Sequence, residues 1–255
     1  MLLMFVLGRD RAYLYGHPER ELTDKEAAGY EDALAQRSTG MPAQYITGHQ
    51  EFWGMDLIVT PAVLIPRPET EHVVEKVLEF VGRAGLPAIS RIVDVGTGSG
   101  CIALALAKEL PQAEVHATDI SPAALEIARA NASRHQLDRR VHFHRADLLA
   151  ELDTQAFDFV VSNPPYVGNL EKDEVQLEVR KFEPRTAVFA GETGMEVIEH
   201  LIPQAWDKLK PSGWLVMEIS GTIAERVRES LSRWCDVQLT TDLQGIPRVA
   251  SARKQ

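Results

Sequence analysis

The sequence predicts an α/β protein, in which a parallel β-sheet is covered by helices on both faces and is preceded by a small helical domain. From Arg91 onward, short apolar strands alternate with helical patterns, as in parallel sheets that are buried on both faces. A glycine-rich turn, Gly96–Gly100, joins the first of these strands to the first helix. Acidic residues stand at three successive strand ends, and the carboxyl ends of the strands are where open parallel sheets bind ligands.

The composition is that of an ordinary globular protein. The chain has 255 residues, of which 45% are hydrophobic and 25% charged, which fits one large domain or one domain with a small appendage. The formal net charge of −10 argues against a protein that grips nucleic acid mainly by its phosphates. No stretch approaches the ~20 apolar residues that span a membrane, so no membrane association is expected.

The cysteines and the N-terminus bear on the cellular compartment. Cys101 and Cys235 are far apart and stand in no metal-ligand spacing, which favours a reduced, cytoplasmic protein without a disulfide framework or a metal site. Cys101 lies in an apolar helix pattern and is expected to be buried by packing. Met1–Leu7 lacks preceding basic residues and a small-residue cleavage site, so it is predicted to be structure and not a signal peptide.

Residues 1–42 are predicted to form the small helical domain. Thr23 and Glu26 form a capping box, in which each side chain satisfies the backbone N–H of the other residue. The helix that begins there runs to about Arg37, and Gly40–Pro42 ends it. The residues expected on its inner side are Ala27, Tyr30 and Leu34.

Residues 43–66 are predicted to form a β-hairpin and a linker arm. The hairpin, with a turn near Gly54, is suggested by three segments, Tyr45–Gly48, Glu51–Trp53 and Asp56–Thr60. The segment Leu64–Glu71 that follows holds two prolines. They force an extended chain that gives way to a helix near Pro68 or Glu69.

Residues 67–255 are predicted to form the sheet domain. Its parallel strands are expected at Ile92–Val95, Val115–Thr118, Val141–His144, Phe157–Val161 and Gly213–Ile219. The helices after them are expected at Cys101–Leu110, from Ser121 to Ala132, at Gly194–Leu209 and at Ile223–Trp234. Glu171–Val188 is a long, irregular, charged connection, a kind of segment that is often functional. Val237–Thr240 and Arg248–Ala252 are expected to pair at a sheet edge.

The loop Gly96-Thr97-Gly98-Ser99-Gly100 favours a nucleotide-like cofactor, because glycines there let the backbone turn sharply and approach a ligand closely. A nicotinamide dinucleotide usually meets the spacing G-x-G-x-x-G, whereas this loop has G-x-G-x-G and follows the acidic Asp94. Asp94 would repel a pyrophosphate. It suits the cationic amino acid end of S-adenosylmethionine, either directly or through an organising hydrogen bond.

The next two strand ends extend this predicted cofactor site. Asp119 ends the second strand and is predicted to accept hydrogen bonds from both hydroxyls of a ribose. Asp147 ends the third strand and adds a polar group near the expected adenine, and Leu148 beside it is placed to pack on the adenine plane. A lone aspartate at a strand end is usually a helix cap, but three at successive strand ends favour a binding site.

The turn Asn163-Pro164-Pro165-Tyr166 follows the buried strand expected beside the first one. The two prolines end the strand and hold the Asn163 side chain and the neighbouring carbonyls in a stiff, extended arrangement. An amide or amino nitrogen is a poor nucleophile because its lone pair is delocalised. The Asn163 oxygen and the Pro164 carbonyl can accept both hydrogens of such an NH₂ group and aim its lone pair at a methyl donor. Tyr166 offers an aromatic wall for a flat acceptor.

The chain resembles the peptide chain release factor glutamine methyltransferases, the PrmC/HemK family. The segments that carry the resemblance are Tyr45–Gly48, Leu64–Glu71, Asp94–Gly100, Asn163–Tyr166 and Glu183–Arg185. The resemblance covers nearly the whole chain in the right order. It implies a Rossmann-like sheet of the class I S-adenosylmethionine-dependent methyltransferases, joined by a β-hairpin to a helical domain that helps to dock the release factor.

The resemblance also implies an activity and its site residues. The family methylates N5 of the glutamine in the Gly-Gly-Gln loop of class 1 release factors, turning S-adenosylmethionine into S-adenosylhomocysteine. Carried across, Gly96–Gly100, Asp119 and Leu148 would hold the cofactor and Asn163–Tyr166 the glutamine amide. Arg67 and Glu69 would support the substrate channel. The chain starts inside what should be the second helix of the N-terminal domain, so this domain is expected to be shortened. Either docking of the release factor is then weakened or the chain start is artificial.

Three other functions are open to this sequence. The same Asn-Pro-Pro-Tyr turn serves nucleic-acid adenine or guanine N-methyltransferases, although the charge of −10 and the proline-rich arm count against them. A binding module would hold the release factor without turnover. A nicotinamide oxidoreductase would bind NADH tightly. The leading prediction is a protein glutamine methyltransferase.

Overall fold

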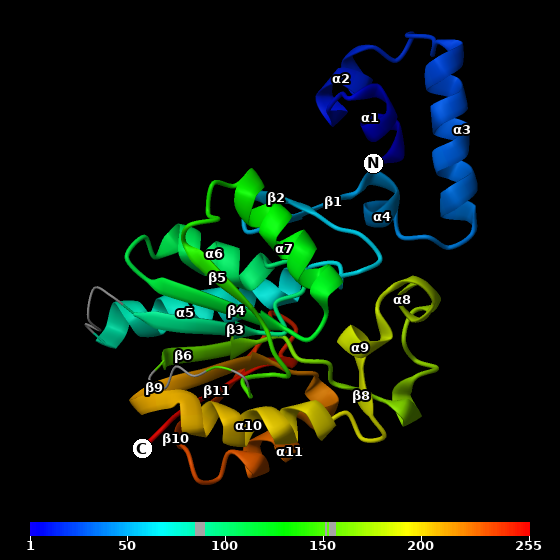
Figure 1. Cartoon of the computed structure of the whole chain (residues 1–255). Coiled ribbons are helices and arrows are strands. Elements are labelled where there is room, and N and C mark those ends of the chain that lie inside the picture. Colours follow the sequence, from blue (N-terminus) through cyan, green and yellow to red (C-terminus); the bar gives the residue numbers. More distant parts are fainter. Residues whose placement is uncertain (85–89, 151, 153–156) are drawn as a thin grey trace.

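The computed structural model describes residues 1–84, 90–150, 152 and 157–255. Its centre is a seven-stranded sheet in the order β10-β11-β9-β6-β3-β4-β5 (Figure 1). The parallel strands are β3 (Arg91–Val95), β4 (Glu114–Asp119), β5 (Val141–Arg145), β6 (Phe157–Ser162) and β9 (Leu209–Glu218). The antiparallel edge pair is β10 (Cys235–Thr241) with β11 (Pro247–Arg253). The predicted parallel sheet and edge pair are confirmed.

The sheet reverses its strand order between β3 and β6. The chain runs outward from β3 through β4 to β5 and then returns to place β6 on the other side of β3. A crevice forms at such a reversal, beyond the carboxyl ends of the strands, and it is where open parallel sheets bind ligands. The predicted position of Asn163, at the end of the strand beside the first, is therefore correct.

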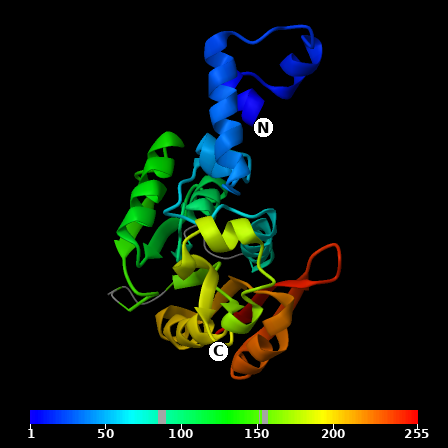
Figure 2. The ribbon, with the colours of Figure 1, turned by 90° about the vertical axis from the view of Figure 1, so that its right-hand side faces the viewer.

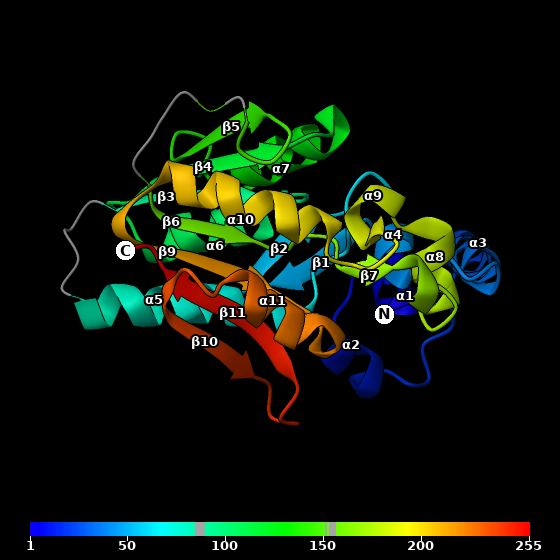
Figure 3. The same ribbon diagram turned by 90° about the horizontal axis from the view of Figure 1, so that it is seen from below.

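Helices cover both faces of the sheet (Figures 1 and 3). One face carries α5 (Glu71–Ala84), α6 (Cys101–Glu109) and α7 (Pro122–Arg134), and the other carries α10 (Glu196–Lys208) and α11 (Ala224–Ser230). Alternate residues of one strand serve the two cores, since Ile92 packs with the first group and Val93 with the second. This double burial explains why the strands are continuously apolar.

The N-terminal helices stand to one side of the sheet domain (Figures 1 and 2). They are α1 (Leu2–Leu7), α2 (Arg11–Gly16) and α3 (Asp24–Ser38). The predicted capping box at the start of α3 is confirmed, with the Thr23 backbone N–H donating to Glu26 over 2.9 Å. The predicted inner side of α3 is partly wrong, because Ala33 is buried whereas Leu34 is 44% exposed. In α1, Phe5 is also exposed.

The predicted hairpin is shorter than expected. It consists of β1 (His49–Phe52) and β2 (Met55–Ile58), with positive φ angles at both Trp53 and Gly54, as a two-residue type I′ turn requires. The segment before it forms α4 (Ala43–Thr47) and not a strand, because Gly48 adopts the left-handed conformation that ends a helix. The arm ends in a 3₁₀ turn, η1 (Pro68–Thr70), that leads into α5, as predicted.

The connection after β6 is more ordered than its sequence predicts. It contains η2 (Asn169–Glu171), α8 (Leu177–Phe182) and α9 (Arg185–Val188), between the paired short strands β7 (Val167–Gly168) and β8 (Phe189–Gly191). The helix predicted at Ile223–Trp234 is also split, into η3 (Gly221–Ile223) and the shorter α11. Within the described ranges, no helix has both the length and the apolar character needed to cross a membrane.

Candidate active site

Two cavities, each of about 400 Å³, lie at the carboxyl ends of β3, β4 and β6. This volume is within the usual range of small-molecule sites. One cavity is lined by the glycine-rich loop, and we call it the loop cavity. The other is lined by the whole Asn-Pro-Pro-Tyr turn, and we call it the turn cavity. Leu64, Asn163, Pro165 and Ala187 line both. The two cavities therefore share a wall that contains the Asn163 side chain.

Most of the residues predicted to bind a cofactor line the loop cavity. They are Gly96, Thr97, Gly98, Ser99, Asp119, Asp147, Leu148 and Asn163. Two others, Asp94 and Gly100, do not line it. All six residues predicted to bind the acceptor line the turn cavity, namely Arg67, Glu69, Asn163, Pro164, Pro165 and Tyr166.

The glycine-rich loop leaves open space where side chains would stand. Gly96 and Gly98 have φ angles of +70° and +56°, and a Cβ atom on either would meet no other group within 4 Å. The backbone N–H of Gly98 donates to Asp119 Oδ2 over 2.9 Å, and that of Ser121 donates to Oδ1 over 2.9 Å. Burial raises the pKa of Asp119. The loop is thus a bare cradle with an anchored carboxylate beside it.

Asp94 supports this cradle from beneath. It is 1% exposed, and its Oδ2 accepts hydrogen bonds from the Thr97 hydroxyl over 2.6 Å and from the Ala103 N–H over 3.1 Å. It therefore ties the loop to the first turn of α6. Burial raises the pKa of Asp94 to about 7, and its Oδ1 has no hydrogen-bond partner within the described residues. Of the two predicted roles for Asp94, direct contact or an organising hydrogen bond, the geometry favours the second.

Gly100 has a packing reason for its identity. Its φ angle is +86°, and a Cβ atom there would lie 3.3 Å from both Ala128 and Leu104. A glycine at this place lets α7 approach the start of α6 closely. Cys101, next along the chain, packs against the core as predicted, but it is only half-buried and lines the loop cavity, so its expected burial is only partial. Burial still raises the pKa of its thiol to about 12.

A chain of hydrogen bonds runs behind Asn163. Its Nδ2 donates to the Thr70 hydroxyl over 3.1 Å, and that hydroxyl donates to Glu218 Oε2 over 2.6 Å. The Tyr166 hydroxyl donates to the other carboxylate oxygen over 3.0 Å. Burial raises the pKa of Glu218, and burial together with Glu218 raises the pKa of Tyr166. The polar side chains of the turn are therefore held by one buried carboxylate, which itself lines the turn cavity.

A second buried carboxylate holds the proline-rich arm. Glu183 forms an ion pair with Arg67 and accepts a hydrogen bond from the Ile65 N–H over 3.3 Å. Its side chain is only 1% exposed, and burial raises its pKa although Arg67 acts in the opposite direction. The arm is thereby fixed to the connection that contains α8 and α9.

Sequence reasoning assigned no role to Thr70 or Glu218, and quoted Glu183 only as part of a motif. One signal was present for Glu218, which is a lone charge at the end of the apolar run Leu215–Met217. A charged residue in a strand that is buried on both faces is a candidate for a functional site. Thr70 carried no comparable signal, since its partner Glu218 is 148 positions away in the sequence.

Helix α8 joins the turn cavity to the N-terminal helices. Val179 of α8 lines this cavity. On the other side of the same helix, Glu178 forms an ion pair with Arg37 over 2.9 Å, and Lys181 donates to the Thr39 carbonyl over 2.9 Å. The cavity wall is thus in direct contact with the end of α3.

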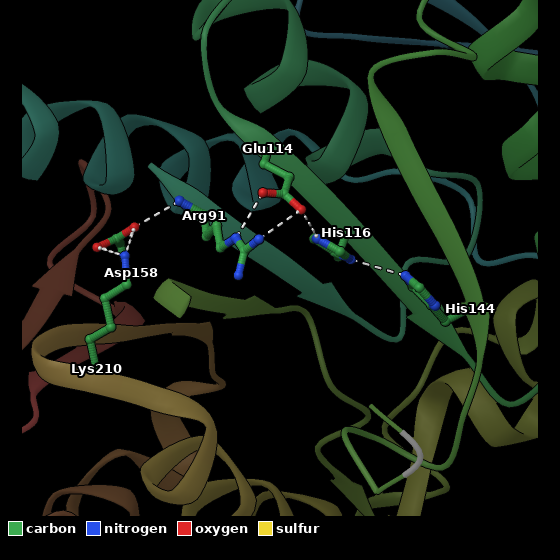
Figure 4. A network of polar contacts seen from close by, with 6 residues as sticks. All are labelled: Arg91, Glu114, His116, His144, Asp158 and Lys210. Carbon is green, nitrogen blue, oxygen red and sulfur yellow. Dashed lines mark hydrogen bonds and ion pairs between the residues drawn. The ribbon is translucent and has the colours of Figure 1, made fainter. Parts of the chain in front are cut away.

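A further polar network lies at the amino ends of the strands, away from both cavities (Figure 4). Asp158 binds Lys210 over 2.9 Å and accepts from the Arg91 N–H over 2.7 Å. Arg91 pairs with Glu114 over 2.7 Å, and Glu114 contacts His116 over 3.0 Å. The contacts of Asp158 and Arg91 join neighbouring strands, whereas Glu114 and His116 both belong to β4, and the network is structural. In the part of the chain that the structure describes, no group of three or more His, Cys, Asp or Glu residues is arranged to hold a metal ion.

Comparisons of sequence agree with this geometry. Residues 82–181 match the family model "Methyltransferase small domain", and residues 1–48 match "PrmC N-terminal domain". A release factor glutamine methyltransferase of Koribacter versatilis is 55% identical over 255 residues, which are 100% of this chain and 89% of that protein. The Escherichia coli protein of the same name is 39% identical over 256 residues, with 99% of this chain and 90% of the relative covered.

Comparisons of structure show the same fold in more distant proteins. The hMettl16 catalytic domain in complex with MAT2A 3'UTR hairpin 1 has a TM-score of 0.62 at 18% identity, covering 91% of this chain and 81% of the other. The Thermus thermophilus 16S rRNA N2 G1207 methyltransferase RsmC, in complex with AdoMet and guanosine, has a TM-score of 0.59 at 18% identity, covering 81% and 50%. At this identity the likeness concerns the fold alone.

Proposed function

The chain belongs to the release factor glutamine methyltransferase family, and from this premise we propose that it methylates N5 of the glutamine in the Gly-Gly-Gln loop of class 1 peptide chain release factors. S-adenosylmethionine is the methyl donor and S-adenosylhomocysteine the product. The observation that carries the proposal is the shared wall of the two cavities, which contains Asn163. A donor in one cavity and an acceptor in the other would meet at this residue.

The loop cavity suits S-adenosylmethionine. Bare glycines leave room for the ligand at Gly96 and Gly98, and the anchored Asp119 carboxylate is placed to accept from the ribose hydroxyls. Leu148 and Asp147 line the same cavity, where Leu148 would pack on the adenine and Asp147 would lie near its polar edge. Asp94 fixes the loop through Thr97 and so orients the cavity floor. When bound, the cofactor supplies a methyl group on a positively charged sulfur.

The turn cavity suits a glutamine side chain. The Asn163 oxygen and the Pro164 carbonyl accept the two amide hydrogens, which aims the nitrogen toward the loop cavity. Tyr166 forms the wall beside the flat amide, and Pro165 keeps the turn stiff. No residue has to act as a general base, because the nitrogen becomes acidic once it is methylated. Arg67 and Glu69 also line this cavity and would support the substrate channel.

The remaining parts of the chain receive the protein substrate. Residues 1–42 form the docking domain, residues 43–66 the hairpin and arm, and residues 67–255 the catalytic domain. The contacts of α8 with the end of α3 support a role for the N-terminal helices beside the turn cavity. Because the substrate is a translation factor, we place the reaction in the cytoplasm. A nucleic-acid substrate is not favoured, since the proteins named for one are only 18% identical.

Mass spectrometry tests this proposal. The protein is incubated with S-adenosylmethionine and a purified class 1 release factor, and we expect a mass increase of one CH₂ unit on the glutamine of the Gly-Gly-Gln loop. A release factor with alanine in place of that glutamine and a set of DNA and RNA substrates are the controls. Asn163→Ala should bind cofactor, as measured by calorimetry, but transfer no methyl group. Unmodified release factor with a saturated cofactor site would overturn the proposal.

A further inference from the structure

We propose that Glu218 and Thr70 are positioning residues, which fix the direction of the Asn163 side-chain amide so that its oxygen, and not its NH₂ group, faces the acceptor. The inference rests on the proposed function. It concerns the hydrogen-bond chain in which Asn163 contacts Thr70, which lines the loop cavity, and Thr70 contacts Glu218, which lines the turn cavity. Neither Thr70 nor Glu218 needs to touch the reacting atoms for this role.

The direction of the hydrogen bonds follows from counting hydrogens. An ionised carboxylate only accepts, so the hydroxyls that contact Glu218, those of Thr70 and Tyr166, must both donate to it. The Thr70 hydroxyl has a single hydrogen, which it uses at 2.6 Å on Glu218. Its oxygen can then only accept from Asn163. The amide of Asn163 must turn its NH₂ group toward Thr70, which leaves its oxygen for the cavities.

The opposite direction would make the site unsuitable for a glutamine. If Thr70 donated to Asn163, the amide would turn over and present its NH₂ group to the NH₂ group of the acceptor. Two donors would then face each other, and the acceptor nitrogen would lose one of its two hydrogen bonds. With the oxygen outward, Asn163 and the Pro164 carbonyl together accept an NH₂ group and repel a carboxylate. Buried polar groups of this kind discriminate strongly between a partner that pairs with them and one that does not.

The surroundings of Glu218 make its charge sensitive to pH. It is 2% exposed, and burial raises its pKa, as does Glu69, whereas Arg248 and the hydroxyls of Thr70 and Tyr166 lower it. The charge of Glu218 in turn raises the pKa of the Cys101 thiol in α6. A protonated Glu218 has to donate one hydrogen, which reverses one of its contacts. Activity is therefore expected to fall on the acid side, at a pH above the ordinary range of a glutamate.

Three variants test the inference by steady-state kinetics with a release factor as substrate. Glu218→Gln places a donor beside Thr70, and Thr70→Val removes the hydroxyl with little change of shape. We expect each to lower kcat by about 100-fold, the size of effect seen when one positioned polar group is lost from an active site. Thr70→Ser keeps the hydroxyl and should retain kcat within about threefold of the wild type. Cofactor affinity should remain within about threefold in Glu218→Gln, because Glu218 lines the turn cavity and not the loop cavity.

Further measurements separate positioning from simple support of the fold. Asp158→Asn is the matched control, since Asp158 is also a buried sheet carboxylate but lies in the network of Figure 4, and it should keep the wild-type kcat. The variant Thr70→Val/Glu218→Gln should be no slower than the slower single variant, because both changes act through Asn163. The acid limb of the pH profile should be absent in Glu218→Gln.

Two outcomes distinguish this inference from the proposed function. If the wild type does not methylate the release factor, the proposed function fails and takes the inference with it. If the wild type is active while Glu218→Gln and Thr70→Val keep its kcat, only the inference is overturned. If Glu218→Gln does not fold, the comparison of Thr70→Val with Thr70→Ser decides, and equal kcat values for these two would contradict it.

Discussion

Arg67→Ala is expected to leave a carboxylate buried without its partner. The Glu183 side chain is 1% exposed and pairs with the Arg67 guanidinium, whose side chain is 33% exposed. After the substitution, the Ile65 N–H at 3.3 Å is the hydrogen bond that remains to this carboxylate within the described residues. The arm and the connection should therefore separate or admit water, since an unpaired buried charge is costly.

The size of the effect follows from this geometry. Removing one member of a fully buried ion pair typically costs ~3–5 kcal/mol. Arg67 is one-third exposed, so water can enter its place and screen the carboxylate, and we reduce the expected loss to about 2 kcal/mol. For a chain of this size that corresponds to a fall in Tm of about 6 °C. The measurement is urea-induced unfolding followed by circular dichroism.

The pH dependence provides a sharper test. Arg67 lowers the pKa of Glu183, so its removal should raise that pKa further above the unfolded value. A carboxyl group whose folded pKa is raised loses its contribution to stability as pH rises through the folded pKa. The difference in unfolding free energy between wild type and Arg67→Ala should therefore be larger at pH 8 than at pH 5. Adding Glu183→Gln to Arg67→Ala should recover most of the loss, and a double variant no more stable than Arg67→Ala would refute the reasoning.

Three other predictions concern the walls of the site. Gly194→Ala should lower the free energy of unfolding by about 2 kcal/mol, measured in urea, because a Cβ atom there would lie 2.5 Å from the Tyr166 carbonyl oxygen. Asp119→Ala should weaken S-adenosylmethionine binding about tenfold or more by calorimetry, because the Gly98 N–H and the ribose lose their shared acceptor. Burial raises the pKa of Asp94 to about 7, so the stability of the cofactor-free protein should fall as pH rises from the ordinary range of an aspartate to about 7. A urea titration of Asp94→Asn should show a smaller fall, and an unchanged one would contradict this assignment.

The sequence predicted those parts of the fold that depend on local patterns. Continuous apolar strands alternating with amphipathic helices identified the parallel sheet, and the spacing of Thr23 and Glu26 identified a helix start. The prediction of a strand over Tyr45–Gly48 failed because a segment as short as the five residues of α4 fits a strand or one helical turn equally well. The left-handed Gly48 that ends this helix also fits the start of a hairpin. Whether such a short segment becomes a helix or a strand is determined by the residues that it packs against.

The residues of the candidate site also divide into those that the local sequence predicts and those that it does not. The glycine-rich loop and the Asn-Pro-Pro-Tyr turn are contiguous in sequence, so their chemistry could be inferred from residue types. The carboxylates that support them could not, because Glu218 meets Thr70 across 148 positions and Glu183 meets Arg67 across 116. Pairings of that range depend on the order of strands in the sheet. A single sequence predicts the residues that line the cavities better than those that hold them in place.

These two buried carboxylates act on different properties of the turn cavity. Glu183 fixes the walls, because it joins the arm to the connection that α8 links to the N-terminal helices. Glu218 fixes hydrogen positions, because it determines which way Thr70 and Asn163 donate. Arg67→Ala, which loosens the cavity wall, should therefore raise the KM for the release factor and lower stability. Glu218→Gln, which changes the direction of the hydrogen bonds, should lower kcat. If Arg67→Ala and Glu218→Gln changed the same kinetic parameter to the same extent, this division between the two carboxylates would be wrong.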